Sequence, residues 1–123
     1  MRKPPLYKSF SNALNGIFQM MKSERNFQIE LFALLINLFL IVLLKLNSVD
    51  TALILTVCFA VLSAEIFNTA LEKICDVIQP EFDSRIGFIK DISAGAVMLM
   101  AFLSVIVGIL VYAKYFKILF HLN

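Results

Sequence analysis

Several residue types that carry chemistry in other enzymes are scarce in this chain of 123 residues. Its four glycines are too scattered to form a phosphate-binding loop, so backbone amides of a Gly-rich turn could not hold a nucleotide. The single histidine, His121, lies in the C-terminal tail, and we expect no catalytic role for it. Cys58 and Cys75 lie in apolar surroundings without a CxxC pair, which predicts buried reduced thiols rather than a disulfide or a metal site.

Charge is also sparse, and this excludes one class of partner. Charged residues make up 16% of the chain, the net charge is +2, and there is no long basic run, which argues against nucleic acid. The hydrophobic fraction is 60% and the mean hydropathy +0.86, whereas soluble domains are typically about 45–50% apolar. The composition therefore predicts one membrane-embedded domain covering residues 1–123.

Three apolar stretches are long enough to cross a bilayer core of about 30 Å, which takes roughly 20 helical residues. We predict membrane helices at about 27–46, 48–78 and 90–115. Only Glu30 and Asn37 interrupt the apolar core of the first stretch, and the third contains a long run without any charge.

Short polar segments connect these spans. Ser48 or Asp50 is the expected cap of the second span, after a tight turn. Pro80 and Gly87 are expected to punctuate a polar loop before the third span. The apolar run begins near residue 27 without a small-residue cleavage site, so we expect the first span to stay in the membrane rather than act as a secretory signal.

The segment at about 6–24 has a different pattern. Apolar residues recur there at helical spacing, at Phe10, Ala13, Leu14, Ile17 and Met21. Asn12 and other polar residues occupy the opposite side, which is typical of a helix lying in the membrane interface. The predicted fold is therefore an all-α membrane protein with an N-terminal amphipathic interfacial helix and three transmembrane helices.

The distribution of lysine and arginine predicts the orientation, because cytoplasmic segments carry an excess of them. The N-terminal arm and the second loop hold Arg2, Lys3, Lys8, Lys22, Arg25, Lys73, Arg85 and Lys90. The opposite side holds Lys45, Lys114 and Lys117. We therefore expect the N-terminus and the second loop to face the cytoplasm.

The second span ends in a polar stripe. Glu65, Asn68, Glu72 and Asp76 are spaced three, four and four residues apart, which places them on one face of a helix. A helix over 48–78 would measure about 46 Å at 1.5 Å per residue, so its last turns must emerge from the hydrocarbon. Asp76 taken alone could be a solvated surface group. Glu65 lies nearer the membrane, where ionisable side chains are costly and usually functional.

Other charged residues are expected at the same level. Glu24 and Glu30 flank the start of the first span, and Lys90 and Asp91 begin the third. So many carboxylates would repel one another unless a divalent cation intervened, and Mg²⁺ commonly binds one or two carboxylates plus substrate phosphates. The residues thus suggest a metal-dependent site that handles phosphate at the lipid surface.

Three motifs resemble one known family. They are "SERNFQIE" (23–30), "EIFNTALEKICD" (65–76) and "KDISAGAV" (90–97). Together they are similar to the small prokaryotic integral-membrane lipid kinases, the diacylglycerol and undecaprenol kinases, over residues 9–117. The resemblance implies a bacterial plasma-membrane enzyme that transfers phosphate from ATP to a membrane lipid alcohol with Mg²⁺, and a homotrimer whose subunits share their sites.

The resemblance also implies roles for individual residues in the chemistry. Glu65 matches the proposed general base, which takes the proton of the lipid hydroxyl, and Asn68 matches the asparagine beside it. Glu24 and Glu72 match the carboxylates that hold Mg²⁺ on the ATP phosphates. These four residues form the expected catalytic centre.

Further residues match positions that bind the substrates. The implied ATP-binding set is Asn12, Glu24, Glu72, Glu81, Asp83, Lys90 and Asp91, although position 83 is often histidine in the family. The implied lipid-binding set is Glu30, Glu65 and Ala94. Ala94 resembles the undecaprenol kinase version of the third motif, since diacylglycerol kinases of Gram-negative type have serine there. Undecaprenol is therefore the expected lipid, with diacylglycerol as the alternative.

Two other classes of protein share some of these features. Small proton-coupled transporters also combine a short chain, several spans and a membrane-embedded glutamate. Such exporters are expected to have four spans and to carry the glutamate in the first, whereas here the carboxylates gather at one interface. A membrane protein that only binds a partner is the third possibility. Mg²⁺-dependent ATP consumption that requires a lipid alcohol would separate the kinase from both.

Overall fold

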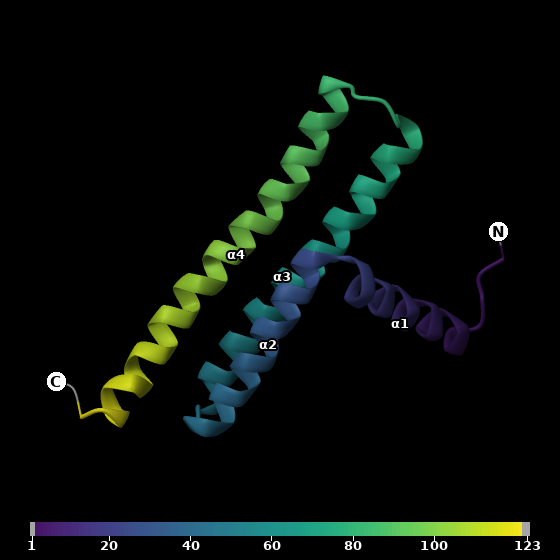
Figure 1. Ribbon diagram of the computed structural model, residues 1–123. Coiled ribbons are helices and arrows are strands. Elements are labelled where there is room, and N and C mark those ends of the chain that lie inside the picture. Colours follow the sequence, from purple (N-terminus) through teal and green to yellow (C-terminus); the bar gives the residue numbers. More distant parts are fainter. Residues whose placement is uncertain (1, 122–123) are drawn as a thin grey trace.

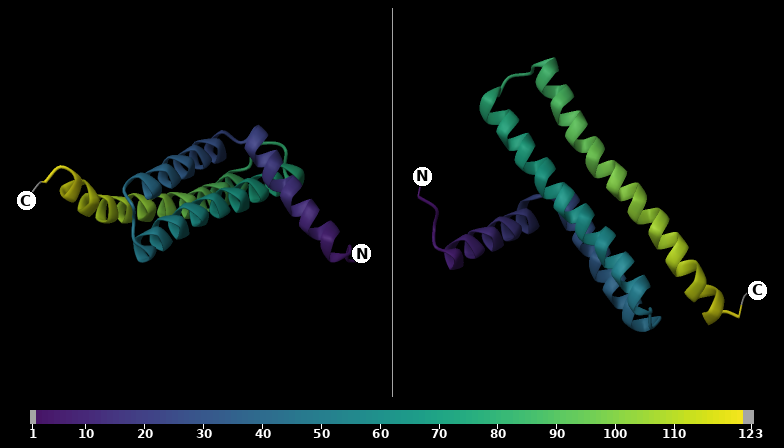
Figure 2. Two further views of the ribbon diagram at one scale, coloured as in Figure 1. Left: turned by 90° about the horizontal axis from the view of Figure 1, so that it is seen from below. Right: turned by 180° about the vertical axis from the view of Figure 1, so that it is seen from behind.

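The computed structural model describes residues 2–121 and consists, over that range, of four helices joined by short connections (Figure 1). Their bounds are Leu6–Ser23 (α1), Arg25–Leu43 (α2), Ser48–Ile78 (α3) and Ser84–Leu119 (α4). The last three run antiparallel to their neighbours in the chain, and α1 turns away where α2 begins (Figure 2). The predicted architecture of a short N-terminal helix followed by three long apolar helices is confirmed.

A single residue joins α1 to α2. Glu24 has extended backbone angles (φ −106°, ψ 111°) and is at once the residue that ends α1 and the one that precedes α2. The Gln28 side chain of α2 donates a hydrogen bond to the Met21 carbonyl of α1 across this corner (2.9 Å). Apolar side chains fill its inner side, namely Met20, Phe27, Leu34 and Leu62. The corner is therefore packed and not a free hinge.

The turn between α2 and α3 differs from the predicted one. Lys45 adopts a left-handed conformation (φ 54°), and the amides of Lys45 and Leu46 bond back to the carbonyls of Val42 and Ile41. This pattern is a Schellman motif, and it ends α2 at Leu43 rather than near 46.

The cap of α3 is also not one of the two expected residues. The side chain of Asn47 accepts a hydrogen bond from the backbone N–H of Asp50 (2.8 Å), so Asn47 is the N-cap and both Ser48 and Asp50 lie inside the helix. The prediction of Ser48 or Asp50 as the cap was wrong because several adjacent residues have capping side chains.

The connection between α3 and α4 is shorter than predicted. Asp83 accepts a hydrogen bond from the Arg85 N–H (2.8 Å) and starts α4 at Ser84, six residues before the expected 90. Gly87, expected in the loop, therefore lies within the helix. At its other end α4 continues to Leu119, beyond the expected 115. The stabilisation that a capping aspartate gives to the helix is larger than the small destabilisation caused by one glycine within it.

The three long helices differ greatly in how much of their surface is packed. In the most apolar part of each helix, 33% of α3 is buried, against 11% of α2 and 6% of α4. Helix α3 is thus the central helix, and its largest interface is with α4. All three are long and apolar enough to cross a membrane. Both cysteines are free in the described chain; Cys75 is buried, as predicted, whereas Cys58 is only half-buried.

Candidate active site

The polar stripe of α3 changes from buried to exposed along its length. Glu65, Asn68 and Thr69 are all buried, with no more than 9% of each residue exposed. One turn later Glu72 is half-buried, and Asp76 is exposed. Thr69 was not singled out from the sequence, although its spacing of four from Glu65 could have identified it. The stripe therefore has a buried end at Glu65 and an open end at Asp76.

Asn68 has one satisfied and one unsatisfied side-chain group. Its amide nitrogen donates to the Glu72 carboxylate (3.2 Å), which fixes the orientation of the amide because a carboxylate only accepts. Its Oδ1 atom is buried and has no hydrogen-bond partner within residues 2–121. Buried polar atoms in proteins are nearly always paired. An atom left in this state points to a ligand.

Three other carboxylates lie in the same region as Glu65. They belong to Glu30, Glu72 and Glu24, and they are near enough for their charges to act on the Glu65 carboxyl group. They come from three places in the chain, α2, α3 and the corner before α2. None of them forms an ion pair with a lysine or arginine in the described part of the chain. The structure thus gathers, uncompensated, the carboxylates that the sequence assigned to one site.

The donors in this region suit a hard divalent cation better than a softer metal. No three Asp, Glu, His or Cys side chains among residues 2–121 converge closely enough to enclose a metal. The oxygen donors available are the carboxylates of Glu24 and Glu72 and the unpartnered Asn68 Oδ1. Mg²⁺ is commonly held by only one or two carboxylates, with phosphate and water completing its shell. The residues present therefore fit a cation that arrives with a phosphate-bearing ligand.

Lys90 reaches toward the open end of the stripe from α4. Its ammonium group pairs with the Asp76 carboxylate at 2.6 Å. The side chain of Asp76 is 64% exposed and that of Lys90 34%, so this ion pair is accessible to solvent. Exposed pairs of this kind contribute little to stability because water screens them. An incoming anion can therefore draw Lys90 away at little cost.

A cavity of about 280 Å³ lies at the tip of the α3–α4 hairpin. It brings together three of the residues expected to bind nucleotide, Glu81, Asp83 and Lys90. Asp83 is held by Arg85, whose guanidinium group donates to both carboxylate oxygens at 3.2 and 2.9 Å. The Arg85 side chain keeps the pKa of Asp83 below its ordinary value. The Asp83 carboxylate therefore stays charged beside the cavity at neutral pH.

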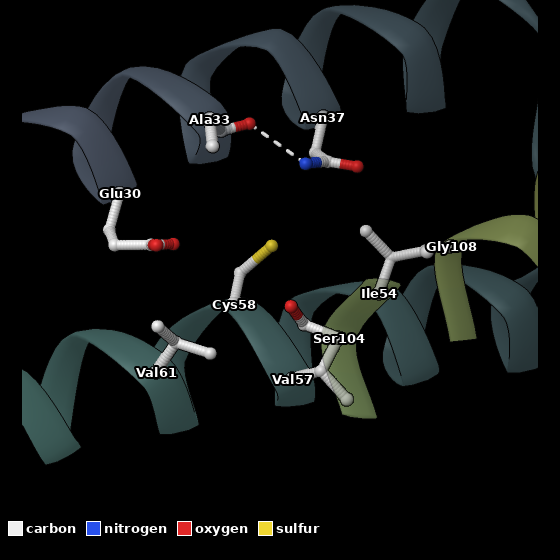
Figure 3. A pocket seen from close by; sticks show the side chains of 9 residues that line it. All are labelled: Glu30, Ala33, Asn37, Ile54, Val57, Cys58, Val61, Ser104 and Gly108. Carbon is white, nitrogen blue, oxygen red and sulfur yellow. Dashed lines mark hydrogen bonds between the residues drawn. The ribbon is translucent and has the colours of Figure 1, made fainter. Parts of the chain in front are cut away.

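A second, smaller cavity of about 70 Å³ lies between α2, α3 and α4. Figure 3 shows Glu30 and Asn37 pointing into it from α2, Cys58 from α3 and Ser104 from α4. Asn37 also accepts a hydrogen bond from the Tyr112 hydroxyl of α4 (2.6 Å). Of these residues only Glu30 was expected at a site. Asn37 stood out in the sequence as a polar residue in an apolar run, but its partners depend on how the helices are rotated.

An apolar groove of about 480 Å³ separates α1 from α3. Its lining is Ala13, Gly16, Ile17, Met20, Ile66, Thr69, Ala70 and Lys73. Thr69 and Ile66 lie in the same helical turns as Glu65, so the groove opens beside the buried end of the stripe. Three other expected site residues, Asn12, Asp91 and Ala94, are exposed, and the side chains of Asn12 and Asp91 form no hydrogen bond within the described chain.

Comparison of the sequence with known proteins identifies the family of this chain. The profile of the prokaryotic diacylglycerol kinases matches residues 11–112. The chain is 33% identical over 106 residues to an undecaprenol kinase of Bacillus subtilis, covering 86% of each protein. It is also 33% identical over 106 residues to a diacylglycerol kinase of a Synechocystis species, covering 85% of this chain and 61% of that protein. The chain, a multi-pass membrane protein with its acidic site at one end of the bundle, therefore belongs to the prokaryotic diacylglycerol kinase family of lipid kinases.

Proposed function

We propose that this chain transfers the terminal phosphate of ATP to the hydroxyl group of a membrane lipid alcohol, with Mg²⁺ as the metal and undecaprenol as the preferred lipid. The observation that carries the proposal is the buried Glu65, surrounded by three further carboxylates and accompanied by the unpartnered Asn68 Oδ1. A buried acidic cluster without cations is costly. It is reasonable where a metal and the phosphates of a substrate complete it.

Glu65 is the proposed general base. Its carboxylate accepts the proton of the lipid hydroxyl as that oxygen attacks the terminal phosphorus of ATP and the bond to ADP breaks. Phosphoryl transfer needs mainly positioning and charge stabilisation from the protein. A single carboxylate at the end of an apolar groove is suited to this, since the groove can hold the lipid chain while its hydroxyl group lies at the polar stripe.

Glu24 and Glu72 are the proposed metal-holding residues. Bound between them and the phosphates, Mg²⁺ would neutralise charge that develops during transfer. Asn68 keeps Glu72 in place through its amide nitrogen and leaves Oδ1 free to face the ligand. The Lys90 ammonium group leaves the Asp76 carboxylate and pairs with a phosphate of ATP. Asp91, Glu81, Asp83 and Asn12 complete the proposed nucleotide site.

Two observations favour undecaprenol over diacylglycerol, which is the alternative. Position 94 is alanine, which resembles the undecaprenol kinase version of the third motif. The groove beside Glu65 is almost wholly apolar, as suits a polyprenyl chain with no ester groups. Glu30 and Ala94 are the proposed further contacts of the lipid.

The proposed setting is the bacterial plasma membrane, with the N-terminus and the site on the cytoplasmic side and three copies of the chain in one assembly. The excess of lysine and arginine at the site end supports this orientation. The exposure of Asn12 and Ala94 supports an assembly in which a neighbouring copy brings these residues to the carboxylates.

The test is a direct competition between lipids. Purified protein in nanodiscs is offered undecaprenol and diacylglycerol together, with ATP labelled in its terminal phosphate, with and without Mg²⁺. We expect label to appear in undecaprenyl phosphate, only in the presence of Mg²⁺. Predominant labelling of phosphatidic acid would establish the alternative lipid. No labelled lipid of either kind, with correctly folded protein, would overturn the proposal.

A further inference from the structure

A second polar cluster lies at the opposite end of the bundle from the carboxylates. It consists of Asn47, Asp50, Lys114 and Tyr115, and is called the Asp50 cluster below. Asp50 is 4% exposed and accepts hydrogen bonds from the Lys114 ammonium group (3.0 and 3.1 Å) and from the Tyr115 hydroxyl (2.8 Å). The backbone N–H of Asn47 donates to the same hydroxyl (3.0 Å). The cluster therefore joins the start of α3 to the last turns of α4 through a closed set of bonds.

Apolar packing cannot fix where α4 lies along α3. Helix α4 is apolar on all sides, and only Val111 among its residues is buried. In a membrane the lipid is as apolar as the side chains, so there is little hydrophobic drive to select one register over another. Polar contacts between the two helices must then set the register.

In residues 2–121, polar side chains of α3 and α4 meet at two places, the Lys90–Asp76 pair and the Asp50 cluster. The first is the exposed Lys90–Asp76 pair at the site end. In the proposed reaction Lys90 leaves Asp76 for phosphate. While nucleotide is bound, the Asp50 cluster is therefore the remaining polar contact between the described parts of α3 and α4. It lies 24 residues from Lys90 along α4, about 36 Å for a continuous helix at 1.5 Å per residue.

We propose that the Asp50 cluster positions the nucleotide site from a distance: it holds α4 in register on α3 and so places Lys90, with its neighbour Asp91, at the open end of the polar stripe beside Asp76. Because α4 is one unbroken helix, a shift at Lys114 is carried to Lys90. A slip of one turn moves Lys90 by about 5.4 Å, more than an ion contact can follow. The proposal rests on the proposed function in that Lys90 and Asp91 are taken to hold ATP.

Kinetics separate positioning from mere stability. Glu30 and Glu65, the proposed contacts of the lipid substrate, lie on α2 and α3, whereas Lys90 and Asp91, the proposed contacts of ATP, lie on α4. In Asp50→Asn and Lys114→Met we therefore expect KM for ATP to rise roughly tenfold or more, since misplacement by about 1 Å can cost about 10²-fold, while KM for the lipid stays unchanged. Asp50→Glu, which keeps the charge, should restore KM for ATP at least partly. Tyr112→Phe is the matched control, because it removes a bond from α4 to α2 and should leave both constants unchanged.

A distance measurement tests the register without relying on activity. Spin labels are placed at Val77 on α3 and Phe88 on α4, both exposed, in a chain with both cysteines replaced by alanine. Labelled chains are diluted into unlabelled ones so that each assembly carries one pair. We expect one narrow distance for the parent and a shifted or broadened distance distribution in Asp50→Asn. Tyr115→Phe, which removes a single bond to Asp50, serves if Asp50→Asn does not fold.

Each outcome decides the proposal. A changed distance together with a raised KM for ATP supports it. An unchanged distance overturns it, and so does a changed distance with an unchanged KM for ATP. If the parent protein phosphorylates no lipid, the proposed function fails, and that failure is distinguishable because the distance measurement still reports whether the Asp50 cluster sets the register.

Discussion

Two buried acidic residues of α3, Asp50 in its first turn and Glu65 near its middle, are in opposite states. Asp50 accepts hydrogen bonds from Lys114 and Tyr115, so its charge is compensated within the chain. Glu65 forms no ion pair within residues 2–121, and Asn68, one turn later, has a buried oxygen without a partner in that range. Proteins rarely leave buried polar atoms unpaired unless something else pairs them. Within one helix, then, a buried carboxylate whose charge is compensated indicates a structural role, whereas an unpartnered buried amide oxygen beside an uncompensated carboxylate indicates a ligand.

The sharpest test of this contrast is Glu65→Gln. The change keeps the shape of the side chain and removes the group that accepts the proton, so we expect turnover to fall by about 10²–10⁴-fold, the usual contribution of general acid–base catalysis. Nucleotide binding, measured by calorimetry, should persist. Ser63→Ala, an exposed change in the same helix, is the control. Turnover close to that of the parent in Glu65→Gln would refute the assignment of the base.

Glu72→Gln tests whether the polar stripe of α3 holds a metal. Loss of one charged ligand should raise the Mg²⁺ concentration needed for half-maximal activity by about tenfold to hundredfold, since an interaction with a charged group is worth about 1.5–3 kcal/mol. The measurement is a Mg²⁺ titration at saturating ATP. Asn26→Ala, an exposed change near the corner, should leave the titration unaltered. An unchanged Mg²⁺ requirement in Glu72→Gln would remove Glu72 from the metal site.

Stability should respond more strongly to a change at Asp50 than to a change at Asn68. Asn68→Leu removes the unpartnered oxygen along with one hydrogen bond, so we expect the free energy of unfolding to change by no more than about 1 kcal/mol while activity falls. Asp50→Leu leaves the Lys114 and Tyr115 groups without their acceptor and should lower the melting temperature clearly. Thermal unfolding in detergent measures both. A larger loss of stability in Asn68→Leu than in Asp50→Leu would contradict the comparison.

The smallest effect is expected at the hairpin tip, where the ion pair is exposed. Arg85→Ala should let the pKa of Asp83 rise toward its ordinary value, because the Arg85 side chain is the main cause of its lowering. In the parent, the stabilising contribution of this pair is complete above the ordinary pKa of aspartate and is lost as the pH falls through the lowered value. Carboxyl NMR titration checks the shift. An unaltered Asp83 pKa in Arg85→Ala would mean that another group holds it.

The long-range architecture could be predicted from the sequence because it depends on run length and helical period. Apolar runs of about 20 residues predict spans whatever their neighbours. The stripe of Glu65, Asn68 and Glu72 follows from spacing alone. The ends of the helices were harder to predict, because the residues next to Asn47 and Asp83 could also have acted as helix caps.

The partners of the polar residues could not be predicted in the same way. Asn37 meets Tyr112, and Asp50 meets Lys114, only because α4 has one rotation and register on the other helices. Helical spacing within one segment carries no information about either quantity. For the same reason the unpartnered state of Asn68 Oδ1 emerged only from the assembled helices.

The corner at Glu24 has a consequence for how the surface helix can behave. Because this one residue terminates α1 and initiates α2, no slack separates them, and Gln28 braces the bend from inside. Tilting or lifting α1 must therefore turn the backbone that carries the Glu24 carboxylate. A movement of α1 is therefore transmitted to the acidic centre, because no loop lies between them to absorb it.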